Sequence, residues 1–194
     1  MSKFWKEIWD SKGKSSSTDL LFLDGYDHLK IDFSSENLAK DILSHFDIKL
    51  NDSILEAGCG AGFLAREMQN YQYVGVDYSD PLIRKHKELF PHHEVITAEA
   101  NDLPFGDGTF DWAFCYGLFQ YLDNDVYANK VISELDRVSR KGFLLGDLKI
   151  SQTREEHYVY KKSNLKEIKM EISECLYDTN DIERFNAYKI KKVP

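Results

Sequence analysis

The residues best suited to chemistry form one short motif, an acid followed by three glycines at every second position: Glu56, Gly58, Gly60 and Gly62. An apolar stretch precedes the motif and a helical pattern follows it. Glycines at a strand-to-helix turn remove Cβ atoms where a ligand must approach the backbone. The start of a helix adds free N–H groups and a partial positive charge. The motif therefore predicts a site for a nucleotide-like ligand.

The glycines alone leave the type of nucleotide open. The dinucleotide fingerprint G-x-G-x-x-G/A fails when counted from Gly58, because its sixth position is Phe63. Counted from Gly60, it is met at Ala65 and by the later acid Asp77. The glycines could also bind no ligand and only permit a tight contact between helix and strand.

The acid in front of the glycines favours a ligand with a positive charge. A carboxylate at the end of the first strand would repel a pyrophosphate, whereas it suits a cationic amino-acid group. With Glu56 included, the motif resembles the first motif of the class I methyltransferases that use S-adenosylmethionine, an acid followed by G-x-G-x-G.

Later segments resemble the same family in the same order. They are Tyr73–Ser79, Ala98–Phe105, Thr109–Ala113 and Glu134–Val138 with the following Lys141-Gly142. The resemblance covers residues 50–147, about half of the chain. It departs from the family pattern in two places: residues 139–143 lack the usual proline and second glycine, and Gln120 stands where a histidine is common.

The resemblance implies a role for each matching position. Asp77 would take both ribose hydroxyls, since a carboxylate has two acceptor oxygens for a vicinal diol. Tyr78 would lie against the adenine face. A Glu99 oxygen would accept from the adenine amine, the Ala100 N–H would donate to a ring nitrogen, and the carbonyl near Cys115 would accept from the cofactor's ammonium. The implied cofactor-binding residues are Glu56, Gly58, Cys59, Gly60, Gly62, Asp77, Tyr78, Glu99, Ala100 and Cys115.

The implied reaction needs alignment more than a catalytic group. Methyl transfer from a sulfonium is an in-line displacement, so the protein must hold a nucleophile about 3–3.5 Å from the carbon and exclude water. We name no catalytic residue; Tyr116, Gln120 and Tyr26 are the candidates for the acceptor pocket, with Asp147 as a further polar or basic group. Phe119 is expected to pack in the core, and His157 has only its residue type in its favour. The remaining histidines are interpreted as surface residues: His28, His45, His86, His92 and His93.

Composition limits the class of protein. The 194 residues carry a net charge of −8, and residues 1–150 hold 25 of the 33 Asp and Glu but only 16 of the 25 Lys and Arg. An acidic body argues against binding a nucleic-acid backbone. Three widely spaced cysteines predict neither disulfides nor a zinc site, and we expect no metal. We find no membrane-spanning run or signal peptide, and expect a cytoplasmic monomer or homodimer.

Alternation of strand and helix patterns predicts one α/β domain over residues 1–194, with a parallel sheet covered on both faces. The resemblance to the methyltransferases implies that this sheet is doubly wound, mostly parallel and seven-stranded. Residues 50–147 form its cofactor-binding core, and residues 151–194 contain a C-terminal antiparallel hairpin. Residues 1–34 are a candidate lid, with a short aromatic helix at 4–9 and a mobile segment at 11–18. The predicted strands are 53–57, 73–76, 94–97, 110–115, 143–145, 169–177 and 184–190. The predicted helices are 62–69, 80–90, 124–139 and one that runs to about Phe46 with Ser35 as its N-cap.

Together these observations predict an enzyme that transfers a methyl group from S-adenosylmethionine to a small acceptor and leaves S-adenosylhomocysteine. The alternatives are a protein or RNA methyltransferase, and a regulatory protein that binds the cofactor without turnover, because fold and motif do not establish catalysis.

Overall fold

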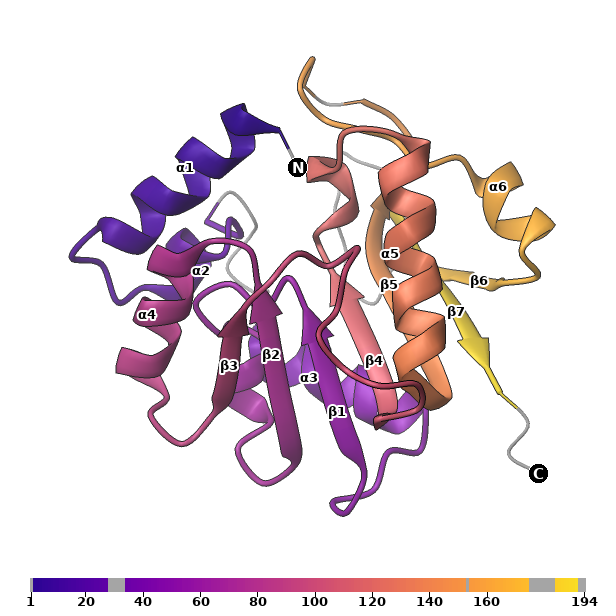
Figure 1. The fold of residues 1–194 in the computed structure, drawn as a ribbon, viewed down its shortest axis with the longest axis horizontal. Coiled ribbons are helices and arrows are strands. Elements are labelled where there is room, and N and C mark those ends of the chain that lie inside the picture. The colour runs from indigo at the N-terminus through magenta and orange to yellow at the C-terminus, as the bar shows by residue number, and fades with distance from the viewer. Residues whose placement is uncertain (1, 28–33, 153, 175–183, 192–194) are drawn as a thin grey trace.

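A seven-stranded sheet forms the centre of the protein (Figure 1). The computed structural model describes residues 2–27, 34–152, 154–174 and 184–191. The strands lie in the order β3-β2-β1-β4-β5-β7-β6. They are β1 (Ser53–Ala57), β2 (Gln72–Asp77), β3 (Glu94–Thr97), β4 (Phe110–Tyr116), β5 (Ser139–Lys149), β6 (Glu171–Glu174) and β7 (Arg184–Ile190). The first five are parallel, and β7 runs antiparallel to both β5 and β6. The prediction of a mostly parallel sheet with an antiparallel C-terminal edge is confirmed.

The strand order reverses between β1 and β4. From β1 the chain proceeds outward through β2 to β3, then returns to pair β4 with the other side of β1. A crevice forms beyond the carboxyl ends of parallel strands at such a reversal, since the two connections leave in opposite directions. The glycine motif follows β1 directly and therefore lies at this point.

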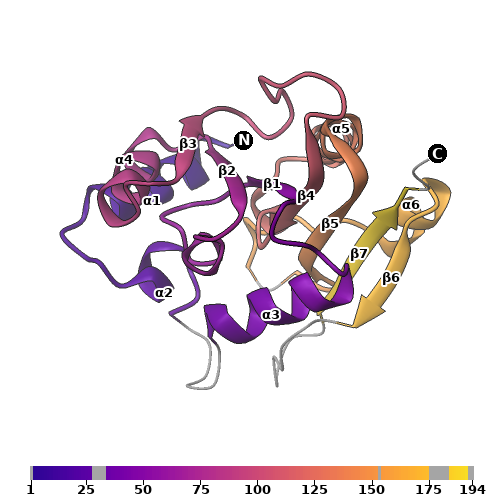
Figure 2. The same cartoon turned by 90° about the horizontal axis from the view of Figure 1, so that it is seen from below.

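Helices cover both faces of the sheet (Figure 2). They are α1 (Lys3–Lys14), α2 (Leu20–Leu23), α3 (Ser35–His45), α4 (Asp80–Leu89), α5 (Asp125–Val138) and α6 (Lys162–Glu167). Successive strand residues point to opposite faces. Ile54 accordingly joins the core beneath α3, whereas Leu55 joins the core beneath α5.

The N-terminal helix is longer than its sequence suggests. We predicted a helix at 4–9 followed by a mobile segment, but α1 continues to Lys14, so the mobile segment is wrong for residues 11–14. The reason is tertiary packing, because Gly13 lies against the backbone of Pro81 and Leu82 at the start of α4. A further correction concerns the start of α3. Its N-cap is Ser34 and not the predicted Ser35, because the Ser34 hydroxyl accepts a hydrogen bond from the Asn37 N–H.

Two central elements also differ from expectation. The predicted helix at 62–69 is wrong, since only a short 3-10 turn forms there, at Ala65–Glu67. Gly62 (φ 107°) has a positive φ that a helix cannot include, so the turn begins after it. The strand predicted at 143–145 extends over all of β5, which pairs with β4 on one side and β7 on the other. Since β5 begins directly after α5, the family's usual turn is absent here.

The C-terminal hairpin is confirmed in its pairing. β6 and β7 are antiparallel neighbours, with Ile172 opposite Ala187. The residues between the two strands, among them the turn signal Asp178-Thr179-Asn180-Asp181 and the cysteine Cys175, lie outside the described residues, as does His28. Within the described part of the chain, no helix has the length and apolar character needed to cross a membrane.

Candidate cofactor and acceptor site

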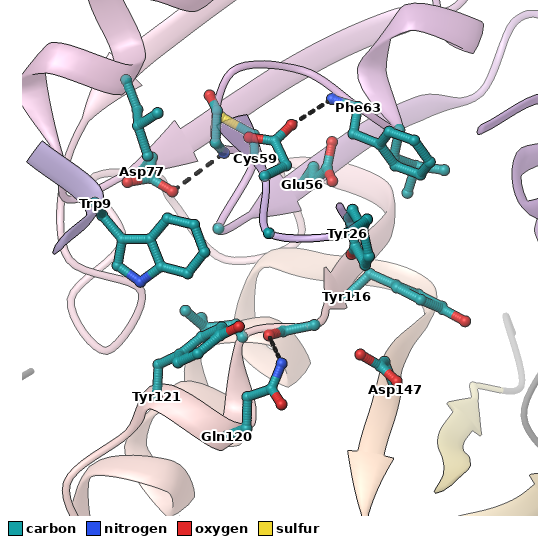
Figure 3. Close-up of a pocket in the computed structure, with 18 of the residues that line it drawn as sticks. Trp9, Tyr26, Glu56, Cys59, Phe63, Asp77, Tyr116, Gln120, Tyr121 and Asp147 are labelled. Carbon is teal, nitrogen blue, oxygen red and sulfur yellow. Dashed lines mark hydrogen bonds between the residues drawn. The ribbon is translucent and has the colours of Figure 1, made fainter. Parts of the chain in front are cut away.

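A hollow of about 690 Å³, counted out to its mouth, opens beyond the carboxyl ends of β1, β2 and β4 (Figure 3). Its lining comes from the N-terminal segment, the glycine loop, β2 and the ends of β4 and β5: Trp9, Asp24, Gly25, Tyr26, Glu56, Gly58, Cys59, Gly60, Phe63, Leu64, Asp77, Tyr78, Leu82, Tyr116, Gly117, Leu118, Gln120, Tyr121, Asp147 and Arg184. The hollow therefore joins the predicted cofactor motif to the predicted acceptor residues.

Backbone hydrogen bonds hold the glycine loop against β2. The N–H groups of Gly58 and Cys59 both donate to the Val76 carbonyl, at 2.7 and 3.0 Å. The third glycine of the motif serves packing, because a Cβ on Gly62 would lie 2.8 Å from the Phe90 ring. Gly62 thus shapes the loop from behind, whereas Gly58 and Gly60 line the hollow.

Glu56 places a carboxyl group at the floor of the hollow. Its side chain is buried, and Oε2 accepts a 2.6 Å hydrogen bond from the Tyr73 hydroxyl. Burial raises the pKa of Glu56 to about 8, an effect that the hydrogen bond from Tyr73 only partly offsets. A cationic ligand next to this group would favour its charged form.

Asp77 ends β2 with both carboxylate oxygens at the hollow's wall. Oδ2 accepts from the Gly60 N–H at 3.1 Å and Oδ1 accepts from the Ser79 N–H at 2.8 Å. Each oxygen keeps a second lone pair for a ligand. Burial raises the pKa of Asp77 to about 6, against the lowering effect of the two backbone bonds.

A smaller hollow of about 200 Å³ lies beside the first. The two share Gly58, Asp77, Tyr78 and Leu118. The smaller hollow adds Glu99 and Ala100, so the predicted adenine contacts lie next to the predicted ribose contact. Cys115 is buried in the core under α5 and lines neither hollow.

Asp24 is a site residue that sequence reasoning missed. It follows α2, and its oxygens accept from the N–H groups of Ala61 and Phe63 at 2.6 and 2.7 Å. Burial raises the pKa of Asp24 to about 7, against the lowering effect of the two backbone hydrogen bonds. In the sequence, an aspartate before a glycine indicates only a turn, so nothing there pointed to the glycine loop.

The acceptor candidates Tyr26, Tyr116 and Gln120 all line the same hollow, at the end away from Asp77 (Figure 3). The Gln120 amide donates to the Gly117 carbonyl at 3.2 Å. The Tyr116 ring lies across Gly146, where a Cβ would come within 2.0 Å of it.

Asp147 points into the hollow because β5 is irregular there. It has a left-handed backbone (φ 61°), and the register with β7 shifts between Leu145 and Leu148. Such irregularities redirect a side chain. The Asp147 carboxylate forms a buried ion pair with Arg184, which also lines the hollow. Arg184 was missed, since it lies in an edge strand far along the chain with no motif around it.

Two tryptophans of α1 lie at the hollow or next to one of its lining residues. Trp9 lines it, and Trp5 packs on Tyr121 at 4.7 Å and on His157 at 5.3 Å between ring centroids. The Trp5 indole N–H donates to the Glu156 carbonyl at 3.1 Å. The helix is docked at its other side, where Asp10 accepts from the Ser79 hydroxyl at 2.7 Å. Whether residues 1–34 move as a lid stays a prediction.

Phe119 and His86 were both predicted to lie outside the site, and the structure confirms the predicted environment of only the first. Phe119 is buried in the core, as expected. His86, interpreted as a surface residue, has no exposed surface, and this interpretation is wrong. It lies on the inner side of α4 with Nδ1 at 3.2 Å from the Gly60 carbonyl and Nε2 at 3.1 Å from His93 Nδ1. Burial lowers the pKa of His86 to about 4, so the ring is neutral at pH 7.

Within the described part of the chain, we find no grouping of His, Cys, Asp and Glu that could hold a metal ion.

The buried acids predict that stability decreases as pH rises. The folded-state pKa values of Glu56 and Asp24 exceed their unfolded values, so between pH 6.5 and 8 the folded state binds more protons than the unfolded state. We expect the free energy of unfolding, measured in urea, to fall by about 1–2 kcal/mol across this range from Glu56 alone. The Glu56→Gln variant should show a flatter profile. An equally steep profile in that variant would contradict the assignment.

Comparison with known proteins finds methyltransferases among the similar sequences. A family described as "Methyltransferase domain" matches residues 55–145. The chain is 27% identical over 140 residues to the malonyl-[acyl-carrier protein] O-methyltransferase of Buchnera aphidicola, covering 71% of this chain and 51% of that protein. It is 31% identical over 120 residues to the tRNA (carboxymethyluridine(34)-5-O)-methyltransferase of Arabidopsis thaliana, covering 60% of this chain and 29% of that protein. The chain thus spans about half or less of the length of these two relatives.

Solved structures share the fold. The magnesium protoporphyrin IX methyltransferase of Synechocystis, solved with S-adenosylmethionine bound, superimposes with a TM-score of 0.65 at 14% identity, over 98% of this chain and 92% of that chain. At this level of identity the likeness shows the fold alone.

Proposed function

We propose that this chain, whose residues 55–145 match a family described as a methyltransferase domain, belongs to the class I S-adenosylmethionine-dependent methyltransferases and transfers a methyl group from S-adenosylmethionine to a small acceptor. The observation that carries the proposal is the convergence of Glu56, the left-handed Gly58–Gly60 loop and Asp77 on one hollow. A carboxyl group at its floor favours a cationic ligand and disfavours a pyrophosphate.

The residues present fit the proposed cofactor. Asp77 has a free lone pair on each oxygen for the two ribose hydroxyls, and the adjoining hollow offers Tyr78, Glu99 and Ala100 to a base. Glu56 lies beneath the loop, where it would attract the positive end of the ligand. When bound, the cofactor supplies a methyl group already activated by its sulfonium.

The chain's own contribution is then to orient the acceptor and exclude water. Tyr26, Tyr116 and Gln120 would line the acceptor's side of the hollow, and Asp147 would offer it a hydrogen-bond acceptor. The aromatic cover of Trp9 and Tyr121 limits the size of a molecule that can enter. A small acceptor is therefore favoured over a protein or an RNA, and the net charge of −8 adds to the case against RNA.

The proposal is tested by methyl transfer. The protein is incubated with S-adenosylmethionine labelled in its methyl group, in parallel with a set of small acceptors, total RNA and a protein extract. We expect label to appear in a small product together with S-adenosylhomocysteine. Label in RNA or protein would overturn the small acceptor, and cofactor binding without transfer to any of the three would indicate a regulatory binding protein.

A further inference from the structure

Asp24 reaches the glycine loop from the N-terminal segment. Asp24 follows the last residue of α2, where its backbone N–H donates to the carbonyl of Leu20, the first residue of that helix, and its carboxylate extends to the loop. A Cβ on Gly60 would lie 2.2 Å from Asp24 Oδ1. Position 60 therefore needs a glycine for two reasons. A side chain there would collide with the Asp24 carboxylate, and the backbone has a left-handed conformation (φ 50°).

This contact changes what the loop can bind. The N–H groups of Ala61 and Phe63 point out of the loop, where they would suit an anion. Asp24 accepts from both, with one oxygen for each. A ligand carboxylate would have to displace Asp24, whereas a ligand cation would gain a carboxylate oxygen with a lone pair to spare.

The charges around Asp24 also favour a cation. Asp77 from β2 faces it across the loop, and Glu56 from β1 interacts with both carboxylates. Lys12 from α1 is the basic group that acts on Asp24, but its ammonium group donates to the Phe22 carbonyl at 2.6 Å. Tyr26, two residues on, keeps a neutral hydroxyl, because burial raises its pKa well above the usual value.

We propose that Asp24 binds the α-ammonium group of S-adenosylmethionine and so fixes the amino-acid end of the cofactor on the glycine loop. This inference rests on the proposed function. It assigns the ammonium contact to a residue of the N-terminal segment, in place of the carbonyl near Cys115, a residue that is not among those lining either hollow. The same segment carries Tyr26, so cofactor binding and the acceptor wall would be tied together.

The test compares ligands with and without the ammonium group. S-adenosylhomocysteine contains it, whereas 5′-methylthioadenosine has the same nucleoside and a thioether but no amino-acid end. By calorimetry, Asp24→Asn should bind S-adenosylhomocysteine about 10- to 100-fold more weakly than the natural chain, the range for losing a charged hydrogen bond. Its affinity for 5′-methylthioadenosine should change less than about twofold.

Each alternative gives a different result. Equal weakening of both ligands would mean that Asp24 only holds the loop, and no weakening of either would remove Asp24 from the site. If the variant does not fold, the Glu56→Gln variant is titrated at pH 6 and pH 8, because it lacks the other buried acid that would face the ammonium group. Protonated Asp24 cannot accept the ammonium's charge, so S-adenosylhomocysteine should gain more affinity between pH 6 and pH 8 than 5′-methylthioadenosine, whose ribose contact with Asp77 titrates for both ligands. The same shift for both ligands would contradict the inference, whereas a natural chain that binds neither ligand would refute the proposed function.

Discussion

Replacement of Asp77 by alanine is expected to weaken S-adenosylmethionine binding by about 1–3 kcal/mol, the scale for leaving polar partners unpaired. The carboxylate anchors the Gly60 and Ser79 N–H groups and keeps one lone pair on each oxygen. Alanine would remove the acceptors for both ribose hydroxyls and release the loop at Gly60. Calorimetric titration of the variant measures the loss.

A matched control separates this effect from a general change in charge. Asp41→Ala removes an exposed carboxylate from α3, outside the two hollows. We expect that variant to bind the cofactor as the natural chain does. If a folded Asp77→Ala protein keeps its full affinity, the ribose assignment is wrong.

Substitution of Gly13 by leucine is expected to detach α1 from the domain and to reduce methyl transfer about 100-fold, the scale for misplaced reacting groups. A Cβ on Gly13 would lie 2.5 Å from backbone atoms of both Pro81 and Leu82, which cannot move aside without shifting the start of α4. Trp5 and Trp9 would lose their buried positions. Trp9 would also leave the hollow, which would then admit water.

Tryptophan fluorescence and activity are measured together for this variant. Exposure of Trp5 and Trp9 should shift the emission to longer wavelength, while the sheet keeps its cooperative unfolding. Lys14→Leu introduces the same side chain at the adjacent exposed position and should change neither. A Gly13→Leu protein with shifted emission but full activity would show that the cover over the hollow is not needed for transfer.

The architecture followed from the sequence because its evidence is local. Strand and helix patterns alternate from residue 53 onward, and the pairing of the last two strands was inferred from their position around a turn signal. Local patterns failed where packing decides the structure. Residues 11–14 have the composition of a loop, but they become helical because Gly13 fits closely against α4.

The candidate site divides in the same way. Most of the residues on the cofactor side of the site were predicted from one motif and from the ends of the strands that follow it, because the sheet brings these segments to one edge. Asp24 and Arg184 lie on segments that reach the hollow only through the tertiary fold. The burial of His86 does have a signal in the sequence: this residue follows Leu82 and Ile83 at helical spacing and so falls on the buried face of α4.

Calorimetric titration with S-adenosylmethionine and with NADH tests the central claim most directly, because the glycine pattern alone admits both classes of ligand. We predict saturable binding of S-adenosylmethionine, tighter at pH 8 than at pH 6 because Glu56 and Asp24 must lose protons to face a cation. At pH 8 NADH should show no binding, since its pyrophosphate would face the Glu56 and Asp24 carboxylates. Binding of NADH without binding of S-adenosylmethionine would contradict the account.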